Sequence, residues 1–139
     1  MKTIASIDAA TSIDIQGITE STIDEYFTRL NNGEFNRAAE LFTAQGQLDP
    51  PVGNSIKGRD LIAQYLAEEA KGMRFCPEDG KLLMSINKYT KYEIQGKVEI
   101  NWFTINVSWS IQLNAEKEIM AIEVKLLASP NDLLSFSRV

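Results

Sequence analysis

Apolar residues recur with two different periods along this chain of 139 residues, and the period changes after Pro77. Before that point the spacing is three to four residues, which is typical of one helix face. It predicts three helices, whose apolar residues are Ile23, Tyr26, Phe27 and Leu30, then Phe35, Ala38, Ala39 and Phe42, then Leu61, Ile62, Tyr65 and Leu66. We expect the helices to end at Asn31-Asn32-Gly33, near Gly46 and at Gly72, with a turn-rich stretch at residues 49–54.

After Pro77, apolar and polar residues alternate, as in antiparallel strands with one buried face. The alternation predicts strands over residues 91–102, 104–113 and 120–126, and it makes Gly96 a bulge or bend. Three helices followed by a curved antiparallel sheet form an α+β domain, in which the sheet curls into a cone with an apolar interior suited to a small molecule.

The two termini flank the predicted helices and sheet, and we expect the C-terminal tail to lie near the cone and to modulate ligand uptake. Residues 1–18 are interpreted as an N-terminal arm with a short extended piece, and residues 19–139 as one domain that includes the C-terminal tail. Residues 129–134 have the pattern of the start of a short C-terminal helix.

Composition and charge exclude several classes of protein. The chain is 44% hydrophobic and 24% charged, as in ordinary globular domains, and its net charge of −5 argues against a nucleic-acid partner. No apolar run is long enough to span a membrane, and Asp8 and Asp14 interrupt any signal-peptide core, so we expect a cytoplasmic protein.

Missing residue types exclude most catalytic sites. The chain has no histidine, which rules out Ser-His-Asp and Cys-His nucleophiles and the common zinc sites. It has neither GxGxxG nor GxxxxGK[ST], and Cys76 is its one cysteine. The sequence therefore predicts neither a metal nor a nucleotide cofactor.

Several short motifs resemble a known superfamily. The run from Tyr26 to Phe35, YFTRLNNGEF, is similar to the opening of nuclear-transport-factor-2-like domains, and Lys57-Gly58-Arg59 fits the same superfamily. Further motifs resemble the C-terminal domain of orange carotenoid proteins: Glu68-Glu69 leading to Pro77-Glu78-Asp79-Gly80, Gly96-Lys97-Val98 with Trp102-Phe103, and Leu126-Leu127-Ala128-Ser129-Pro130 with Leu133-Leu134.

This resemblance covers roughly residues 11–138 and implies a function. The chain is similar to free-standing homologues of that domain in cyanobacteria, which are ketocarotenoid carriers and not enzymes. The resemblance implies a nuclear-transport-factor-2-like cone and a ligand such as canthaxanthin or echinenone. It also implies singlet-oxygen quenching and photoprotection. The implied partners are a second copy, helical carotenoid-binding proteins and, transiently, a carotenoid-containing membrane such as the thylakoid.

The resemblance also assigns roles to individual residues. Tyr26, by its motif, and Trp109, by its place before Leu113-Asn114, match the two donors that hydrogen-bond the keto oxygen in the family. The hairpin between Trp102 and Trp109 is shorter than in the family by about four residues, an even number that keeps the side-chain face. We favour Trp109 over Trp102 as the donor, and ordinary core packing is the alternative for both aromatics.

Position in the family suggests further ligand contacts. The polyene would be lined by six side chains, for which ordinary core packing is the alternative: Met73, Phe75, Ile100, Trp102, Ile111 and Val124. Cys76, next to Pro77 in an expected loop, matches a cysteine implicated in redox-linked dimerisation, and the nearby Arg74 would favour its thiolate. A buried, inert thiol is the alternative.

One enzyme remains as an alternative within the same superfamily. Ketosteroid isomerases carry their catalytic aspartate in an Asp-Pro-Val-Gly context similar to Asp49-Pro50-Pro51-Val52-Gly53. In this hypothesis Asp49 is the general base and Tyr26 polarises the ketone. An exposed aspartate in a turn is the simpler interpretation of Asp49.

Overall fold

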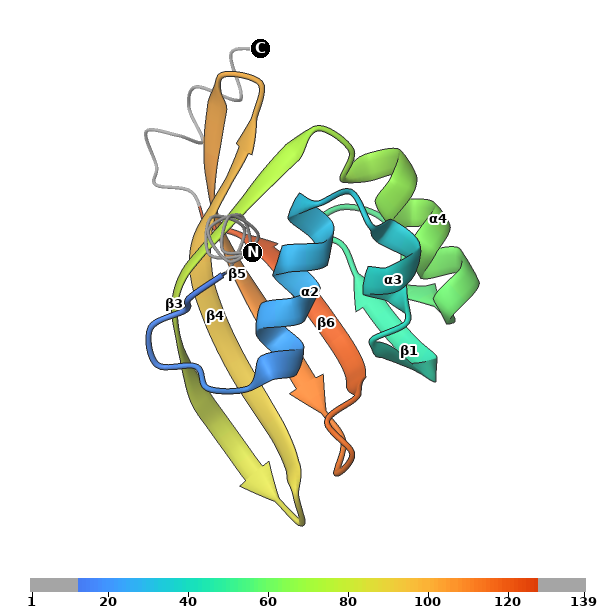
Figure 1. Ribbon diagram of the computed structural model, residues 1–139, viewed down its shortest axis with the longest axis vertical. Coiled ribbons are helices and arrows are strands. Elements are labelled where there is room, and N and C mark those ends of the chain that lie inside the picture. The colour runs from blue at the N-terminus through green and yellow to red at the C-terminus, as the bar shows by residue number, and fades with distance from the viewer. Residues whose placement is uncertain (1–12, 128–139) are drawn as a thin grey trace, which may run out of the picture.

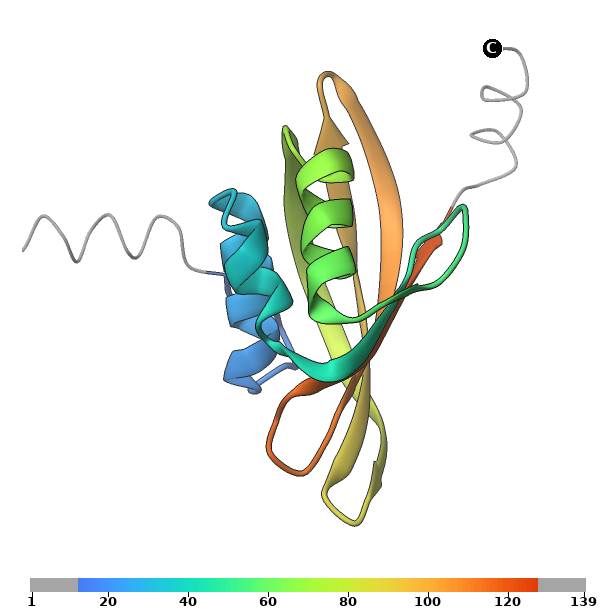
Figure 2. The same cartoon turned by 90° about the vertical axis from the view of Figure 1, so that its right-hand side faces the viewer.

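The computed structural model describes residues 13–127. Its helices are α2 (Ser21–Asn31), α3 (Phe35–Ala39) and α4 (Arg59–Glu69), and its strands are β1 (Phe42–Asp49), β2 (Ile56–Lys57), β3 (Met73–Ile86), β4 (Tyr89–Ile100), β5 (Phe103–Leu113) and β6 (Ile119–Leu126). Within these residues the strands form one sheet of order β2-β1-β6-β5-β4-β3. The three helices lie against one face of the strongly twisted sheet (Figures 1 and 2). The predicted α+β fold is confirmed.

The sheet is mixed, whereas the sequence predicted an antiparallel one. β1 pairs in parallel with β6, while the pairings of β2 with β1 and of β3, β4, β5 and β6 in succession are antiparallel. The last strand therefore inserts beside the first long strand, and the intervening α4 lies on the same side of the sheet as α2 (Figure 2). The sheet stays open, with β2 and β3 at its edges, and the helices cover its concave face (Figure 2).

The second predicted helix is shorter than expected. It ends at Ala39, and residues 42–49 form β1. Phe42 lies on the helical spacing of Phe35 and Ala38, but it also begins the buried alternation that continues with Gly46 and Leu48. A Cβ atom on Gly46 would lie 2.8 Å from the Cβ of Phe42, so the glycine leaves room for the buried phenyl ring. Phe42 fits both the helical spacing and the strand alternation, and its pairing with Ile119 of β6 makes it part of a strand.

The alternation rule missed β3. This strand runs through Pro77 and Gly80, residues that usually argue against a strand. Proline is tolerated here because β3 is at the edge of the sheet, where one row of backbone groups needs no partner strand.

The irregularity expected at Gly96 lies instead in the neighbouring strand β3, and Gly96 itself pairs regularly with Val107 of β5. The pairing of β3 with β4 shifts between Pro77 and Asp79, opposite Gly96. A Cβ atom on Gly96 would lie 2.3 Å from the carbonyl oxygen of Cys76, so the two backbones approach more closely than a side chain allows.

The core fills the space between α2 and the sheet. The predicted apolar face of α2 is buried, and Ile15 and Ile18 from the arm join the same cluster. Gln16 lies beside β3, where its N–H donates to Glu78 O (3.1 Å) and its carbonyl accepts from Gly80 N (2.9 Å). Residues 1–12 of the expected arm and the expected helix at 129–134 lie outside the described residues. Among residues 13–127, no helix is long and apolar enough to cross a membrane.

Candidate functional site

A cavity of about 330 Å³ lies between the concave face of the sheet and the helices α2 and α4. Its wall is made mostly of apolar side chains from α2, α4 and strands β3 to β6, together with the Pro50–Val52 turn. The residues with polar side-chain atoms in this wall are Tyr26, Tyr65, Glu69 and Trp109. A mostly apolar cavity with a few polar groups is typical of small-molecule sites.

Tyr26 reaches this cavity from α2. The residue is 2% exposed, and its ring packs edge-on against Phe27 (centroids 5.4 Å apart) and Phe42 (5.9 Å). Burial raises the pKa of the Tyr26 phenol, and the nearby Tyr65 raises it further, so the hydroxyl stays protonated. Within residues 13–127 this hydroxyl makes no side-chain hydrogen bond, although a buried phenol normally makes one.

Trp109 reaches the same cavity from β5. It is 2% exposed, stands between Ile94 of β4 and Val124 of β6 in the sheet, and packs edge-on against Phe27 with centroids 4.8 Å apart. Its indole N–H, too, has no partner within residues 13–127. Since Phe27 contacts both rings, one side chain supports both donors. Two buried donors in one apolar cavity match a ligand carbonyl, whose oxygen accepts two hydrogen bonds.

The structure divides the side chains expected along the polyene. Met73, Phe75, Ile100 and Val124 line the cavity. Ile111 does not: it is fully buried between Tyr92 and Ile122 in the sheet.

Trp102 also lies away from the cavity wall. It sits in the two-residue turn between β4 and β5 and is 86% exposed. Alternation placed Trp102 on the face of Ile100, but in a turn that rule no longer fixes the direction of a side chain. Trp109 is therefore the tryptophan that lines the cavity.

Two residues of α4 belong to the site although no role was assigned to them from sequence. Tyr65 and Glu69 are one helical turn apart and both line the cavity. Partial burial raises the pKa of the Tyr65 phenol, and the Glu69 carboxylate adds to the effect. Tyr65 was visible as part of an apolar helix face, but the sequence does not show that this face borders a cavity.

Asn31 fixes one wall of the cavity. Its side-chain amide donates to the carbonyl of Phe75 (2.8 Å), and its side-chain oxygen accepts from the N–H of Phe75 (2.7 Å). This paired contact ties the end of α2 to the edge strand β3, next to the Phe75 side chain that lines the cavity. The sequence identified Asn31 only as part of a helix stop.

Asp49 lies on the other face of the sheet. It ends β1 directly after Leu48, which lines the cavity, and successive residues of a strand point to opposite faces. The carboxylate accepts hydrogen bonds from the Gln47 amide (2.9 Å) and from the Ser55 hydroxyl. The geometry thus separates Asp49 from Tyr26 and does not support their joint action on one ketone.

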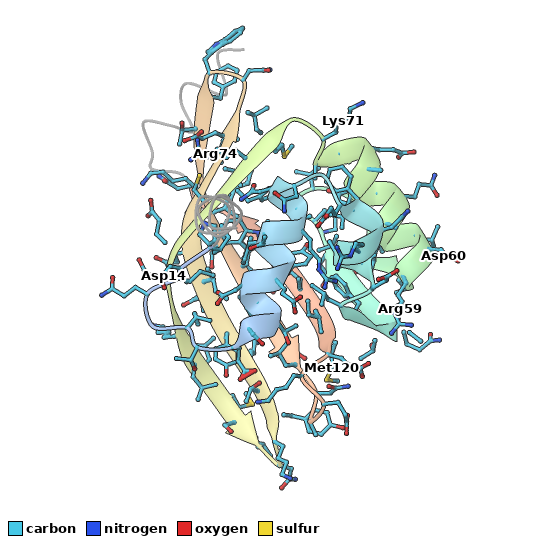
Figure 3. The ribbon with its side chains drawn as sticks, in the orientation of Figure 1. Asp14, Arg59, Asp60, Lys71, Arg74 and Met120 are labelled. Carbon is cyan, nitrogen blue, oxygen red and sulfur yellow. The ribbon has the colours of Figure 1, made fainter. Side chains whose placement is uncertain are left out.

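Cys76 lies within β3 and not in a loop. It is half-buried and pairs with Lys97 of β4, while its neighbour Arg74 is labelled in Figure 3. Burial raises the pKa of the Cys76 thiol, with further increases from Glu99 and Glu78, and the opposing effect of Arg74 is smaller. As expected from the sequence, Arg74 favours the thiolate, but burial and the two carboxylates outweigh this effect and the thiol pKa is raised overall.

Known proteins similar to this chain were found by sequence and by structure, although no protein-family model matches it. The orange carotenoid-binding protein of Synechocystis sp. is 34% identical over 132 residues (92% of this chain), and that of Limnospira maxima is 33% identical over 129 residues (90%). The chain spans only about two fifths of these relatives (42% and 41% of their lengths).

The solved structures give the same picture. The orange carotenoid protein of Anabaena (Nostoc) sp., in a structure binding canthaxanthin, is 34% identical with a TM-score of 0.80, over 89% of this chain and 41% of that one. A nuclear-transport-factor-2-like protein of Cytophaga hutchinsonii shares the fold at 17% identity, with a TM-score of 0.61, over 88% of this chain and 99% of that one. The predicted nuclear-transport-factor-2-like fold is thereby confirmed.

Proposed function

Because the chain is homologous to about two fifths of the orange carotenoid-binding proteins, we propose that it binds a ketocarotenoid in this cavity and transfers it between partners without catalysis. The observation that carries the proposal is the pair of buried, unpartnered donors, Tyr26 and Trp109, in one apolar cavity. A keto oxygen would accept from both, and the apolar wall would hold the adjoining part of the polyene.

The size of the ligand suggests how the complex assembles. A cavity of about 330 Å³ accommodates one ring and the start of a polyene, so the rest of the ligand extends beyond it. Burying that remainder from water favours a second apolar cavity, either in another copy of the chain or in a helical carotenoid-binding protein. Bound in such an assembly, the carotenoid would quench singlet oxygen and so protect the cell against light damage. We place this role in the cytoplasm, near thylakoid membranes.

Mixing the purified chain with canthaxanthin tests the binding proposal. We expect a complex whose absorption is shifted to longer wavelength, because hydrogen bonds to the keto oxygen extend conjugation into the ring. β-Carotene has the same polyene without keto groups and is the matched control, for which we expect no comparable shift. Canthaxanthin that stays unbound, with an unchanged spectrum, would contradict the proposal.

Replacing Asp49 by asparagine separates the carrier from the isomerase. Asparagine has nearly the same shape as aspartate, and its side chain can still reach Gln47 and Ser55, but it has no carboxylate. Because Asp49 lies outside the cavity, we expect Asp49→Asn to bind canthaxanthin with unchanged affinity and colour. If wild type isomerises a Δ5-3-ketosteroid and Asp49→Asn does not, the chain is an enzyme and the carrier proposal is wrong.

Cys76 is proposed to link two copies by a disulfide under oxidising conditions. It is half-buried on β3, and its raised pKa keeps most of the thiol protonated at neutral pH. We therefore expect dimerisation to be slow at neutral pH and to accelerate as the pH rises and thiolate forms. Non-reducing gels should show the dimer in oxidised wild type and not in Cys76→Ser. A wild type that remains monomeric after oxidation at pH 9.5 would show that the thiol is inaccessible.

A further inference from the structure

The turn between β4 and β5 carries the most exposed aromatic residues among the described part of the chain. Trp102 is 86% exposed and Phe103 is 58% exposed, and their ring centroids are 6.0 Å apart. No charged residue occurs from Ile100 to Leu113. Exposing an aromatic pair of this kind to water is unfavourable. Such exposed apolar patches often mark the sites where a protein, a membrane or a ligand binds.

This tip stands at the mouth of the cavity. Ile100 and Ile105, on either side of the turn, line the cavity, as do Val52 and Leu126, which are themselves exposed. The end of β6 is joined to the hairpin by a hydrogen bond from Leu127 N to Asn106 O (2.8 Å). The mouth of the cavity is therefore surrounded by apolar side chains, several of them exposed. A molecule that binds to these side chains also lies over the mouth of the cavity.

The backbone of the hairpin is hydrogen-bonded along the facing edges of β4 and β5 up to the tip. β4 and β5 stay paired up to Ile100 and Phe103, so the tip is closed by the two residues Asn101 and Trp102 alone. Nearly all backbone N–H and C=O groups on the facing edges near the tip are thus hydrogen-bonded within the hairpin. The outer edge of β5 from Phe103 to Ile105 has no partner strand, because the pairing with β6 begins at Val107. The tip therefore suits the hydrated interface of a bilayer and not its hydrocarbon core.

Basic side chains lie toward the same end of the molecule. Lys71, after α4, and Arg74, on β3, are at the end where the β4–β5 turn projects (Figure 3). Arg74 is largely exposed, with the Glu99 carboxylate 4.0 Å away. Both basic groups are placed to contact lipid phosphates beside an inserted aromatic tip, although Glu99 and Glu69 make the charge at this end mixed.

We propose that the tip defined by Asn101, Trp102 and Phe103 docks on a phospholipid bilayer and turns the cavity mouth toward the lipid. Trp102 and Phe103 enter the interfacial region, where aromatic side chains are favoured. The proposal rests on the proposed function, because a lipid-soluble ligand would then pass into the cavity without crossing water. The tip is narrow and convex, whereas a stable protein interface buries roughly 800 Å² on each partner. A fluid bilayer can close around such a tip.

The first test measures docking without ligand. The full chain would be floated with vesicles of phosphatidylcholine and phosphatidylglycerol, comparing wild type with Trp102→Ser/Phe103→Ser. The matched control is Leu83→Ser/Ile86→Ser, which removes two exposed apolar side chains from the hairpin of β3 and β4 at the opposite end. We expect partitioning to fall at least roughly tenfold in the tip variant, since two large apolar side chains lose their burial, and to be unchanged in the control.

The second test separates docking from ligand binding. Canthaxanthin would be offered either in vesicles or in detergent micelles. The tip variant should load from micelles to the wild-type extent but more slowly from vesicles. If no protein loads from either source, the proposed function fails, while flotation still decides whether the tip docks.

Two results would overturn the docking proposal. One is equal flotation of wild type, tip variant and control. The other is a wild-type dimer, detected by sedimentation velocity without lipid, that the tip variant lacks while neither protein floats. In that case the rim is covered by a second copy and not by a bilayer.

Discussion

Replacing Tyr26 and Trp109 together by phenylalanine is expected to abolish most of the red shift of bound canthaxanthin and to weaken its binding. Each neutral hydrogen bond contributes about 0.5–1.5 kcal/mol, so losing both lowers affinity roughly 5- to 150-fold. Each single variant should keep part of the shift and lose roughly two- to twelvefold in affinity. Absorption spectra and titration of the ligand measure both effects.

The controls for this experiment come from the same chain. Trp102→Phe removes the other tryptophan, which is exposed in the β4–β5 turn, and it should leave the colour unchanged. The keto-anchor mechanism is wrong if Trp102→Phe alone abolishes the shift. It is equally wrong if the double variant keeps the wild-type spectrum, since the colour would then arise from the apolar wall.

Phe27→Ala is expected to cause the largest loss of stability. Phe27 is fully buried on α2 and contacts the rings of Tyr26 and Trp109 edge-on. Truncating a buried phenylalanine typically costs about 3–5 kcal/mol, a large part of the roughly 5–15 kcal/mol by which domains are stable. The midpoint of urea unfolding should fall accordingly, and the near-ultraviolet signal of Trp109 should weaken as its ring loses support.

Phe35→Ala provides the comparison, because it makes the same truncation on α3 at a half-buried position. Its effect on the urea midpoint should be clearly smaller. Equal shifts for the two variants would mean that Phe27 does not hold the core in the way its contacts indicate.

Sequence patterns were reliable where the apolar residues of an element repeat with one unambiguous period. The apolar face of α2, the strands β4, β5 and β6 and the stop at Asn31 all follow from local spacing, because the core imposes its period on the side chains. They failed at Phe42, which fits a helix and a strand alike, and at β3, whose Pro77 and Gly80 are acceptable only at a sheet edge.

The sequence by itself determined the fold class and the absence of histidine chemistry, and resemblance added Tyr26 and Trp109 as candidate donors. Only the tertiary structure decided which residues lie together around the cavity. It brought both donors and Tyr65 to one cavity, put Asp49 on the opposite face of the sheet, and left Trp102 at an exposed turn. The physical reason is that alternation and helical period fix the direction of a side chain only within its own element. The neighbours of that side chain depend on strand order, bulges and turns, and these are set by pairing between strands that are far apart in the sequence.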